Sequence, residues 1–150
     1  MKNLFPFFVV LVLIFGVMGC KKDSLLKTEY VEGVVTLGGT AVDNALVTYS
    51  PVDSANGVSA TGYSDGTGKY TLTAVGGGPQ KGVPEGEYNV TVSKMNIETV
   101  TKPPLYPGEE PREETVQTPI LPSIYMKADT TPLKKSVSKG KNTIDLELEK

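Results

Sequence analysis

Two segments of this chain alternate apolar and polar residues with a period of two, and this pattern constrains the fold more than any other feature. Residues 86–94 alternate a tyrosine and two valines with Asn, Thr and Ser, and residues 142–150 alternate an isoleucine and two leucines with acidic residues. Successive side chains of a β-strand point to opposite faces, so each segment offers one face to a core and one to water. We predict that both segments are strands.

The other predicted strands are rich in β-branched residues and end in turn-forming residues. They cover residues 30–37, 45–51, 58–64 and 69–75. Asp65-Gly66-Thr67-Gly68 joins the last two as a predicted hairpin, because its glycines allow the positive φ angles of a tight reversal. No segment after residue 20 has a convincing helical period. Several short strands separated by turns predict an all-β sandwich.

Two segments interrupt the strands. Residues 76–85 are glycine-rich and predict a loop that leads into the strand at residue 86. Residues 102–122 contain six prolines, which cannot donate to a strand ladder, so we do not expect a central strand there. This Pro-rich segment is either a disordered linker or a long loop packed over one end of the sandwich. Its apolar residues favour a loop with ordered ends; they are Leu105, Tyr106, Ile120 and Leu121.

The first 19 residues have the layout of a signal peptide. Lys2 gives a positive start, and residues 4–18 form an uncharged apolar run, shorter than the ~20 residues that a membrane-spanning helix needs. The run ends at Val17-Met18-Gly19-Cys20, which resembles the bacterial lipoprotein box. The resemblance implies that Cys20 receives a diacylglyceryl group, that the chain is cut between Gly19 and Cys20, and that fatty acids such as palmitate anchor the protein.

Other roles for Cys20 are poorly supported. A disulfide needs a second cysteine, and a catalytic or metal-binding thiolate wants histidine or further cysteines nearby, yet the chain has one cysteine and no histidine. An uncleaved anchor and an ordinary secretory signal are the remaining alternatives. We predict that residues 1–19 are a lipoprotein signal peptide, that residues 20–28 are a flexible tether, and that residues 29–150 form a single domain.

Residues 30–94 carry a set of spaced glycine, apolar and turn positions: Gly33, Val35, Ala45, Val47, Asp65, Gly68, Tyr70, Leu72, Pro84, Gly86, Tyr88, Val90 and Val92. In these positions the segment resembles the carboxypeptidase regulatory-like domain, and the final 30 residues resemble, more loosely, the tail of small planctomycete-type lipoproteins. Ser64 replaces the usual threonine, and the connection from Leu72 to Pro84 is longer than usual. The resemblance implies a transthyretin-like, immunoglobulin-like β-sandwich of about seven strands with an accessory, non-catalytic role.

The polar and glycine positions of these motifs have simple structural interpretations. Gly33, Gly68 and Gly86 meet backbone requirements at bulges or turns. Asp65 is expected to cap its own turn through an Asx interaction. The alternative is a calcium ligand, although the oxygen-ligand loop D-x-[DN]-x-[DN]-G is absent. Two rings are predicted to lie in the core, those of Tyr70 and Tyr88.

Groups suited to catalysis are scarce. There is no histidine to act as a general base or metal ligand, and no glycine-rich phosphate loop follows a strand. Four glutamates of the Pro-rich segment are interpreted as solvated rather than catalytic: Glu109, Glu110, Glu113 and Glu114. A serine–lysine cluster, without a recognised nucleophile signature, is interpreted as a polar loop beside a strand; it comprises Lys134, Ser136, Ser138 and Lys139. We predict no enzymatic activity, no cofactor and no metal.

Without residues 1–19 the chain carries 14 basic and 17 acidic side chains, a net charge of −3 that argues against binding to nucleic acid. We predict a membrane-anchored, non-catalytic envelope lipoprotein that acts as a structural or protein-binding module, with an envelope protein or a glycan as partner. The alternative is a carbohydrate-binding module; its candidate stacking residues are Tyr49, which also suits the core, Tyr63, Tyr106 and Tyr125. An atypical hydrolase is a third reading. Lys21 stands where an aspartate retains some lipoproteins in the inner membrane, so we expect the outer membrane.

Overall fold

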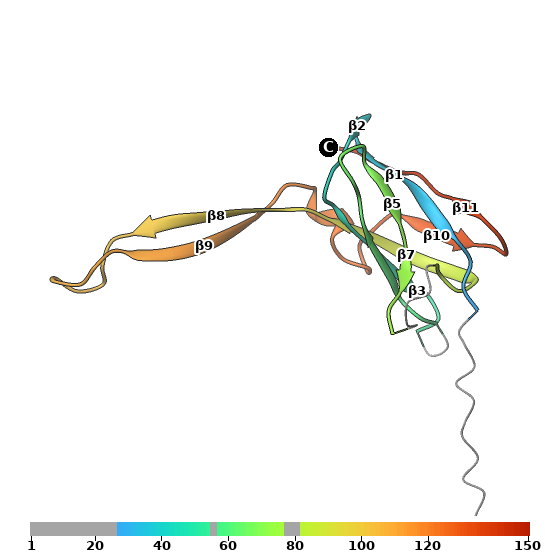
Figure 1. Cartoon of the computed structure of the whole chain (residues 1–150), viewed down its shortest axis with the longest axis horizontal. Helices are drawn as coiled ribbons and strands as arrows, with labels where there is room; N and C mark the ends of the chain where they lie inside the picture. The colour runs from blue at the N-terminus through green and yellow to red at the C-terminus, as the bar shows by residue number, and fades with distance from the viewer. Residues whose placement is uncertain (1–26, 55–56, 77–81) are drawn as a thin grey trace, which may run out of the picture.

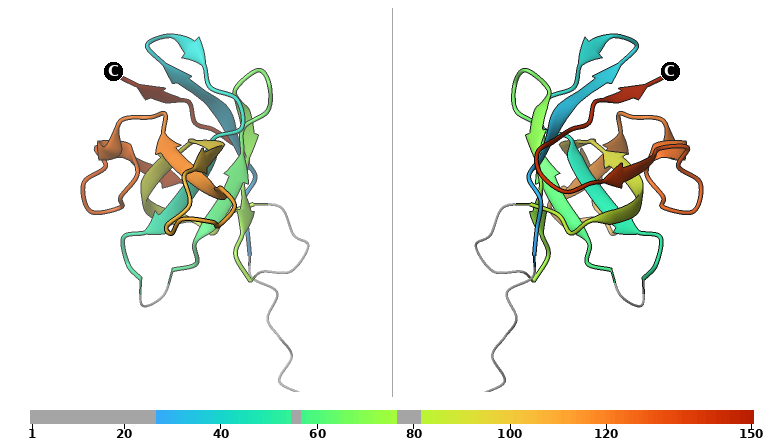
Figure 2. Two further views of the ribbon diagram at one scale, coloured as in Figure 1. Left: turned by 90° about the vertical axis from the view of Figure 1, so that its left-hand side faces the viewer. Right: turned by 90° about the vertical axis from the view of Figure 1, so that its right-hand side faces the viewer.

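The computed structural model describes residues 27–54, 57–76 and 82–150. These residues form two β-sheets packed face to face and a long two-stranded arm that projects from them (Figures 1 and 2). The predicted all-β sandwich is confirmed. The predicted signal peptide, Gly19, Cys20 and most of the predicted tether lie outside the described residues.

The first sheet is built around strand β1 (Val31–Leu37). Two short strands pair in parallel with β1: β11 (Asn142–Thr143) and β12 (Leu146–Leu148). Two others pair with β1 in antiparallel fashion: β2 (Thr40–Ala41) and β5 (Lys69–Thr71). The first strand of the domain therefore pairs with the last, so this sheet joins the two ends of the domain.

The second sheet is antiparallel throughout, in the order β10-β7-β3-β4-β6. Its strands are β10 (Lys134–Val137), β7 (Gly86–Ser93), β3 (Leu46–Pro51), β4 (Ala60–Tyr63) and β6 (Thr73–Ala74). Strand β7 has the predicted alternation, with Tyr88, Val90 and Val92 buried between less buried neighbours. Strand β10 corrects the prediction of a polar loop at residues 134–139, because its four residues pair with β7 along the sheet edge.

The segment predicted as one strand at residues 69–75 divides between the two sheets. Strand β5 pairs with β1 in the first sheet, whereas β6 pairs with β4 in the second. The change occurs at Leu72, which is fully buried and donates its N–H to the Val31 carbonyl at 3.1 Å. The predicted hairpin between residues 58–64 and 69–75 therefore has two ladder pairs, Ala60–Ala74 and Thr61–Thr73. Backbone hydrogen bonds from the Val75 N–H to the Ser59 carbonyl and from the Asp65 N–H to the Lys69 carbonyl, each of 2.8 Å, complete it at its two ends.

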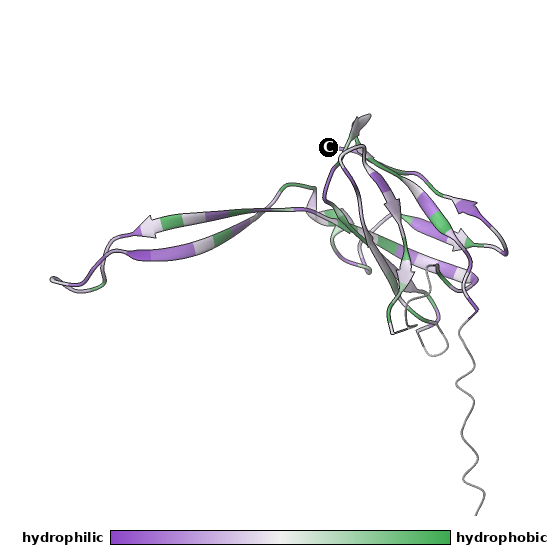
Figure 3. Cartoon of the chain, viewed as in Figure 1, coloured by the Kyte–Doolittle hydropathy of each residue, from purple (hydrophilic) through white to green (hydrophobic). Residues whose placement is uncertain are grey.

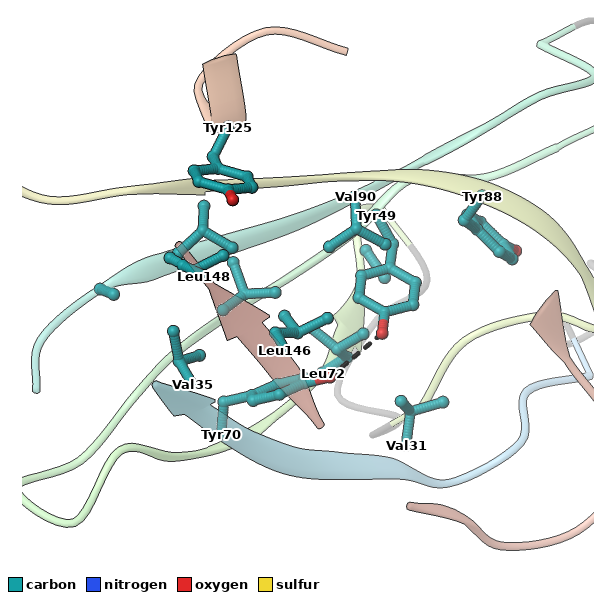
Figure 4. Packing of buried hydrophobic residues seen from close by; sticks show 14 of the residues in the cluster. Val31, Val35, Tyr49, Tyr70, Leu72, Tyr88, Val90, Tyr125, Leu146 and Leu148 are labelled. Carbon is teal, nitrogen blue, oxygen red and sulfur yellow. Dashed lines mark hydrogen bonds between the residues drawn. The ribbon is translucent and has the colours of Figure 1, made fainter. Parts of the chain in front are cut away.

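The core lies between the two sheets and draws on both (Figure 4). The rings of Tyr70 and Tyr88 are buried, as predicted, and so is that of Tyr49. The ring centroids of Tyr49 and Tyr88 lie 5.6 Å apart, a separation at which tilted aromatic pairs attract one another. The apolar side chains of the two alternating segments fill the rest of this space, which explains why the alternation predicted these strands correctly.

A break between β11 and β12 fits a glycine on the neighbouring strand. A Cβ atom added to Gly33 would overlap the Ile144 carbonyl oxygen, so the two backbones approach at a distance that only glycine permits. Beside it, the Val34 N–H donates to Asp145 Oδ1 at 2.9 Å instead of to a strand carbonyl. Gly33 thus meets a backbone requirement, as predicted, but the requirement is a close approach within strand β1 and not a bulge or turn.

The predicted Pro-rich loop at residues 102–122 is in part a strand. Strand β8 (Met95–Lys102) pairs with β9 (Arg112–Pro119) over eight residue pairs, and only the connection between them is irregular. Four of the six prolines lie in that connection, at positions 103, 104, 107 and 111, where no ladder donor is needed. After β9 the chain forms a short 3₁₀ helix, η1 (Ser123–Tyr125), which buries Tyr125.

Candidate functional site

The arm formed by β8 and β9, residues 95–119, is the most unusual feature of the molecule (Figure 1). Eight pairs at about 3.4 Å each make it roughly 27 Å long. All eight residues of β9 are exposed, and so are those of β8 except half-buried Val100. A hairpin with no covering layer is marginally stable in water. The arm therefore exposes both faces and both edges, and this makes it the candidate functional site.

Hydrophilic and hydrophobic residues are mixed along both strands of the arm, as Figure 3 shows. Residues directly opposite each other share a face, so Met95 and Ile97 lie on one face, and Val100 and Val116 lie on the other. Threonines, Gln117 and charged residues separate these apolar positions. Neither face is a continuous apolar stripe. A partner must therefore be recognised by backbone groups and charges as much as by apolar contact.

The two edges of the arm carry unpaired backbone groups. The Ile120 N–H donates to the Lys94 carbonyl at 2.9 Å, so Lys94 and Ile120 are a hydrogen-bonded pair. In an antiparallel ladder hydrogen-bonded and non-hydrogen-bonded pairs alternate, so every second pair from Lys94 and Ile120 onwards is hydrogen-bonded. The backbone N–H and C=O groups of the alternate residues therefore point away from the arm. On β9 these residues include Glu113, Thr115 and Gln117. Such an edge accepts another strand through main-chain hydrogen bonds.

The arm also concentrates acidic charge. It has five glutamates and two basic residues, and the rest of residues 20–150 has 12 acidic and 12 basic residues, so the arm accounts for the whole net charge of −3. Lys102 Nζ pairs with Glu114 at 2.6 Å, and this lysine holds the pKa of that carboxyl below its ordinary value. Among the described residues, the other four glutamates of the arm form no ion pair; they are Glu98, Glu109, Glu110 and Glu113. Three of these four unneutralised charges therefore lie at the tip and on β9, and that of Glu98 lies on β8.

A small cavity of about 260 Å³ lies where the arm joins the sandwich. Apolar side chains from β1 and from the segment after β9 line it, including Leu37, Ile120 and Leu121. At its rim, Lys94 Nζ pairs with Asp43 Oδ1 at 2.7 Å. This pair fixes the start of β8 against the loop before β3, so it positions the arm on the sandwich.

Asp65 lies in the turn before β5 and caps it, as predicted. Its Oδ1 accepts hydrogen bonds from the Thr67 N–H at 2.8 Å, the Thr67 hydroxyl at 2.7 Å and the Lys69 N–H at 3.0 Å. These donors lower the pKa of its carboxyl. Gly68, with φ of 80°, completes the turn, and Gly86 also has a positive φ, of 152°. In the described part of the chain, no three acidic or cysteine side chains gather as a metal site would require.

The serine–lysine cluster does not assemble into a nucleophile and base. Lys134 and Ser136 lie on the outer side of β10, and Ser138 follows that strand. Asn142 holds Ser138 through its backbone, since the Ser138 N–H donates to Asn142 Oδ1 at 3.0 Å. Within residues 27–54, 57–76 and 82–150, no hydrogen bond joins a serine hydroxyl to a lysine amine. The glutamates at 113 and 114 point to opposite faces of β9, so they form no carboxylate pair.

The four candidate stacking tyrosines do not share a surface. Tyr49 and Tyr125 are buried in the core, whereas Tyr63 and Tyr106 are 65% and 67% exposed. Tyr63 ends β4 and Tyr106 lies at the tip of the arm. Because two of the four rings are buried, these tyrosines do not together form a platform on which a sugar could stack.

The arm was missed by sequence reasoning because its polar residues hide the strand period. A signal was nevertheless present, since Met95, Ile97 and Thr99 alternate with polar residues directly after the strand at 86–94. The described residues also contain no helix that is long and apolar enough to span a membrane. A comparison of the chain with protein-family models, with curated proteins and with solved structures found no match.

Proposed function

We propose that this protein is a lipid-anchored, non-catalytic lipoprotein of the bacterial envelope that binds other protein chains through the arm. The single observation that carries the binding role is the arm itself, eight residue pairs long with both faces and both edges exposed. A hairpin of this kind gains stability when its edge or face is covered. Covering by a partner is the function that this geometry supports best.

The anchoring role comes from the sequence of residues 1–20. An apolar run that ends at Gly19-Cys20 supports cleavage before Cys20 and lipid attachment to its sulfur. Each buried CH₂ group of an acyl chain contributes about 0.8 kcal/mol, and stable anchoring takes more than one chain. Lys21 after the cysteine supports the outer membrane. Anchoring raises the local concentration of the sandwich and its arm towards partners on the same surface.

The sandwich serves in this proposal as a rigid mount for the arm. Strand β7 (86–93) continues almost directly into β8 (95–102), and the Lys94–Asp43 pair fixes the residue between them. The described chain begins on the side of the sandwich away from the arm (Figure 1). Lys27, at the end of the predicted tether, pairs with Glu85 at 3.2 Å. An anchor on that side leaves the arm free to reach a neighbour.

The test is cross-linking in intact cells at native expression level, read by mass spectrometry. Three chains are compared: the natural one, one in which residues 97–117 are replaced by Asn-Gly, and Cys20→Ser as the control that keeps the arm. We expect the natural chain to carry lipid on Cys20 and to cross-link through the arm. The shortened chain should keep its lipid and its thermal unfolding but lose the cross-links. Equal cross-linking of the natural and shortened chains would contradict the proposal, as would an unmodified Cys20 still joined to Gly19.

A further inference from the structure

We infer that the arm docks on a second copy of this chain, along the lysine-rich edge formed by β10 and the turn that follows it, residues 134–141. This inference rests on the proposed function, because it names the partner of the same arm. It depends on two surfaces of the molecule that are opposite in charge and that each include the edge strand of a sheet.

The lysine-rich edge is the positive counterpart of the arm. Residues 134–141 contain four lysines and no acidic residue. Lys141 forms an ion pair within its own chain, with its Nζ 2.8 Å from Glu32 Oε1. Among the described residues, the other three lysines form no ion pair; they are Lys134, Lys135 and Lys139. Two acidic side chains stand beside them: Glu87 lies opposite Ser136 on β7, and Glu29 Oε2 accepts the Gly140 N–H at 2.7 Å. The edge therefore keeps an excess of positive charge.

The same edge is open to another strand at Ser136, whereas the outward N–H groups of Lys134 and Ser138 already donate to the Pro132 carbonyl and to Asn142 Oδ1, each at 3.0 Å. Strand β10 is the outermost strand of the second sheet. The Val90 N–H donates to the Leu133 carbonyl at 2.8 Å, so Lys135 and Val137 face β7 and the backbone groups of Ser136 point outwards. The arm offers a matching edge on β9. Adding β9 to β10 brings glutamates of the arm against lysines of the edge while main-chain hydrogen bonds form.

The two surfaces cannot meet within one molecule. The arm leads away from the sandwich, and its tip lies far from β10 (Figure 1). Arm-to-arm pairing is opposed by charge, because each arm carries a net −3. A second copy that presents its lysine-rich edge has the right charge and an open edge, and anchored copies share one membrane surface.

The contact is one-sided, so it can repeat. When the arm of one molecule occupies the edge of a second, the edge of the first and the arm of the second stay free. Contacts of this head-to-tail kind generate rows or rings rather than closed pairs. Exposed ion pairs are weak and screened by salt, so the rows depend on confinement to the membrane and on ionic strength.

The experiment uses the full chain, produced with its own N-terminal residues and reconstituted in lipid vesicles as an equal mixture of light and ¹⁵N-labelled protein. A carbodiimide, which joins a carboxylate directly to an amine in contact with it, is the cross-linker. We expect mixed light–heavy peptides that join residues 109–114 to residues 134–141. Their yield should fall at least about tenfold in 1 M salt, where the screening length is only about 3 Å.

Charge reversal makes the test specific. Glu109→Lys with Glu110→Lys reverses the tip, and Lys134→Glu with Lys139→Glu reverses the edge; all four side chains are exposed, so the sandwich should unfold at an unchanged temperature. Each reversed protein alone should lose the light–heavy links. A mixture of the two should regain them, because the natural arm of one variant then meets the natural edge of the other, and the reversed arm meets the reversed edge.

Three results would overturn the inference. The first is an absence of light–heavy links in the natural protein when Cys20 carries its lipid. The second is an equal yield in the natural and the singly reversed proteins. The third is cross-linking of the arm in cells to a different protein only, which would leave the proposed function intact. Cross-linking of the arm to nothing at all in cells would contradict both.

Discussion

The hydroxyl groups of Tyr49 and Tyr70 lie 3.0 Å apart in the core, and the two residues come from facing sheets (Figure 4). Tyr70 also lies 2.6 Å from the Ile144 carbonyl, which can only accept, so the Tyr70 proton goes there and Tyr49 donates to Tyr70. Burial raises the pKa of Tyr49 to about 12 and raises that of Tyr70 as well. Both phenols therefore stay protonated, and they join β3, β5 and the C-terminal segment.

This direction of donation predicts unequal effects for two conservative changes. Tyr49→Phe removes one donor and one hydrogen bond, at a cost of about 1 kcal/mol of unfolding free energy. Tyr70→Phe leaves the Ile144 carbonyl and the Tyr49 hydroxyl without their partner, at a cost of about 2–3 kcal/mol. Urea unfolding of both variants measures the difference. A larger effect for Tyr49→Phe would contradict this assignment of the donors.

The close approach at Gly33 predicts a severe effect of one methyl group. Gly33→Ala places its Cβ against the Ile144 carbonyl oxygen, so β1 and the C-terminal segment must separate. We expect a loss of about 3 kcal/mol or more, which is large for a single substitution. Gly66→Ala is the matched control, because nothing lies within 4 Å of the added atom. Thermal unfolding should show a large shift for the first variant and almost none for the second; equal shifts would sink this explanation of Gly33.

The buried side chain of Ser64 holds the loop before β3 in place through hydrogen bonds. Its hydroxyl accepts the Ala45 N–H at 2.8 Å and donates to the Val42 carbonyl at 2.7 Å, and the residue is buried. Ser64→Ala leaves both backbone groups unsatisfied, which should lower the unfolding free energy by about 2 kcal/mol. Ser138→Ala is the control, because the same change is made there at an exposed site. Ser64→Gly would be a poorer comparison, because glycine also increases the flexibility of the backbone. Denaturant unfolding that gave both alanine variants the stability of the natural protein would refute this role.

Glu32 predicts how stability changes in acid. Hydrogen bonds with Lys141, Lys69 and Tyr30 lower the pKa of its carboxyl from 4.5 to about 2. A group whose pKa is lower in the folded protein stabilises the fold above its unfolded pKa, and that contribution is lost as the pH falls. We expect stability to decline between about pH 4.5 and 2, and Glu32→Gln to be less stable at pH 7 and flatter across this window. Parallel pH profiles for the two proteins would contradict this assignment.

The sequence predicts the sandwich well and the arm poorly, for one physical reason. Strands with a buried face, such as β7 and β12, must alternate apolar and polar residues, so a period of two reveals them. Strands β8 and β9 have no buried face, so nothing selects apolar residues at alternate positions. Their prolines, which lie mainly in the connecting turn, also obscured the pairing. The candidate site therefore lies in the segment where the alternation of apolar and polar residues is weakest.

Local motifs predicted turns but not the exchange of strands between sheets. The side chain of Asp65 caps its own turn, and a short-range pattern was enough to predict that. The division of residues 69–75 between two sheets depends on Leu72 meeting Val31, a partner about 40 residues away in the chain. Strand β10 is similarly specified by β7 and not by its own residues, two of which are adjacent lysines. Pairing of this kind is tertiary information.

Amide hydrogen exchange distinguishes an arm that a partner covers from one that is exposed to water. The full protein is labelled in its native membrane and, for comparison, as a dilute purified monomer, and the peptide covering Arg112–Pro119 is followed in both. The outward N–H groups of Glu113, Thr115 and Gln117 are exposed in an isolated molecule and paired in a docked arm. We expect this peptide to exchange at least about tenfold more slowly in the membrane, because amides in buried hydrogen bonds are protected. Exchange at the same fast rate in both samples would show that nothing covers the arm and would contradict its proposed role.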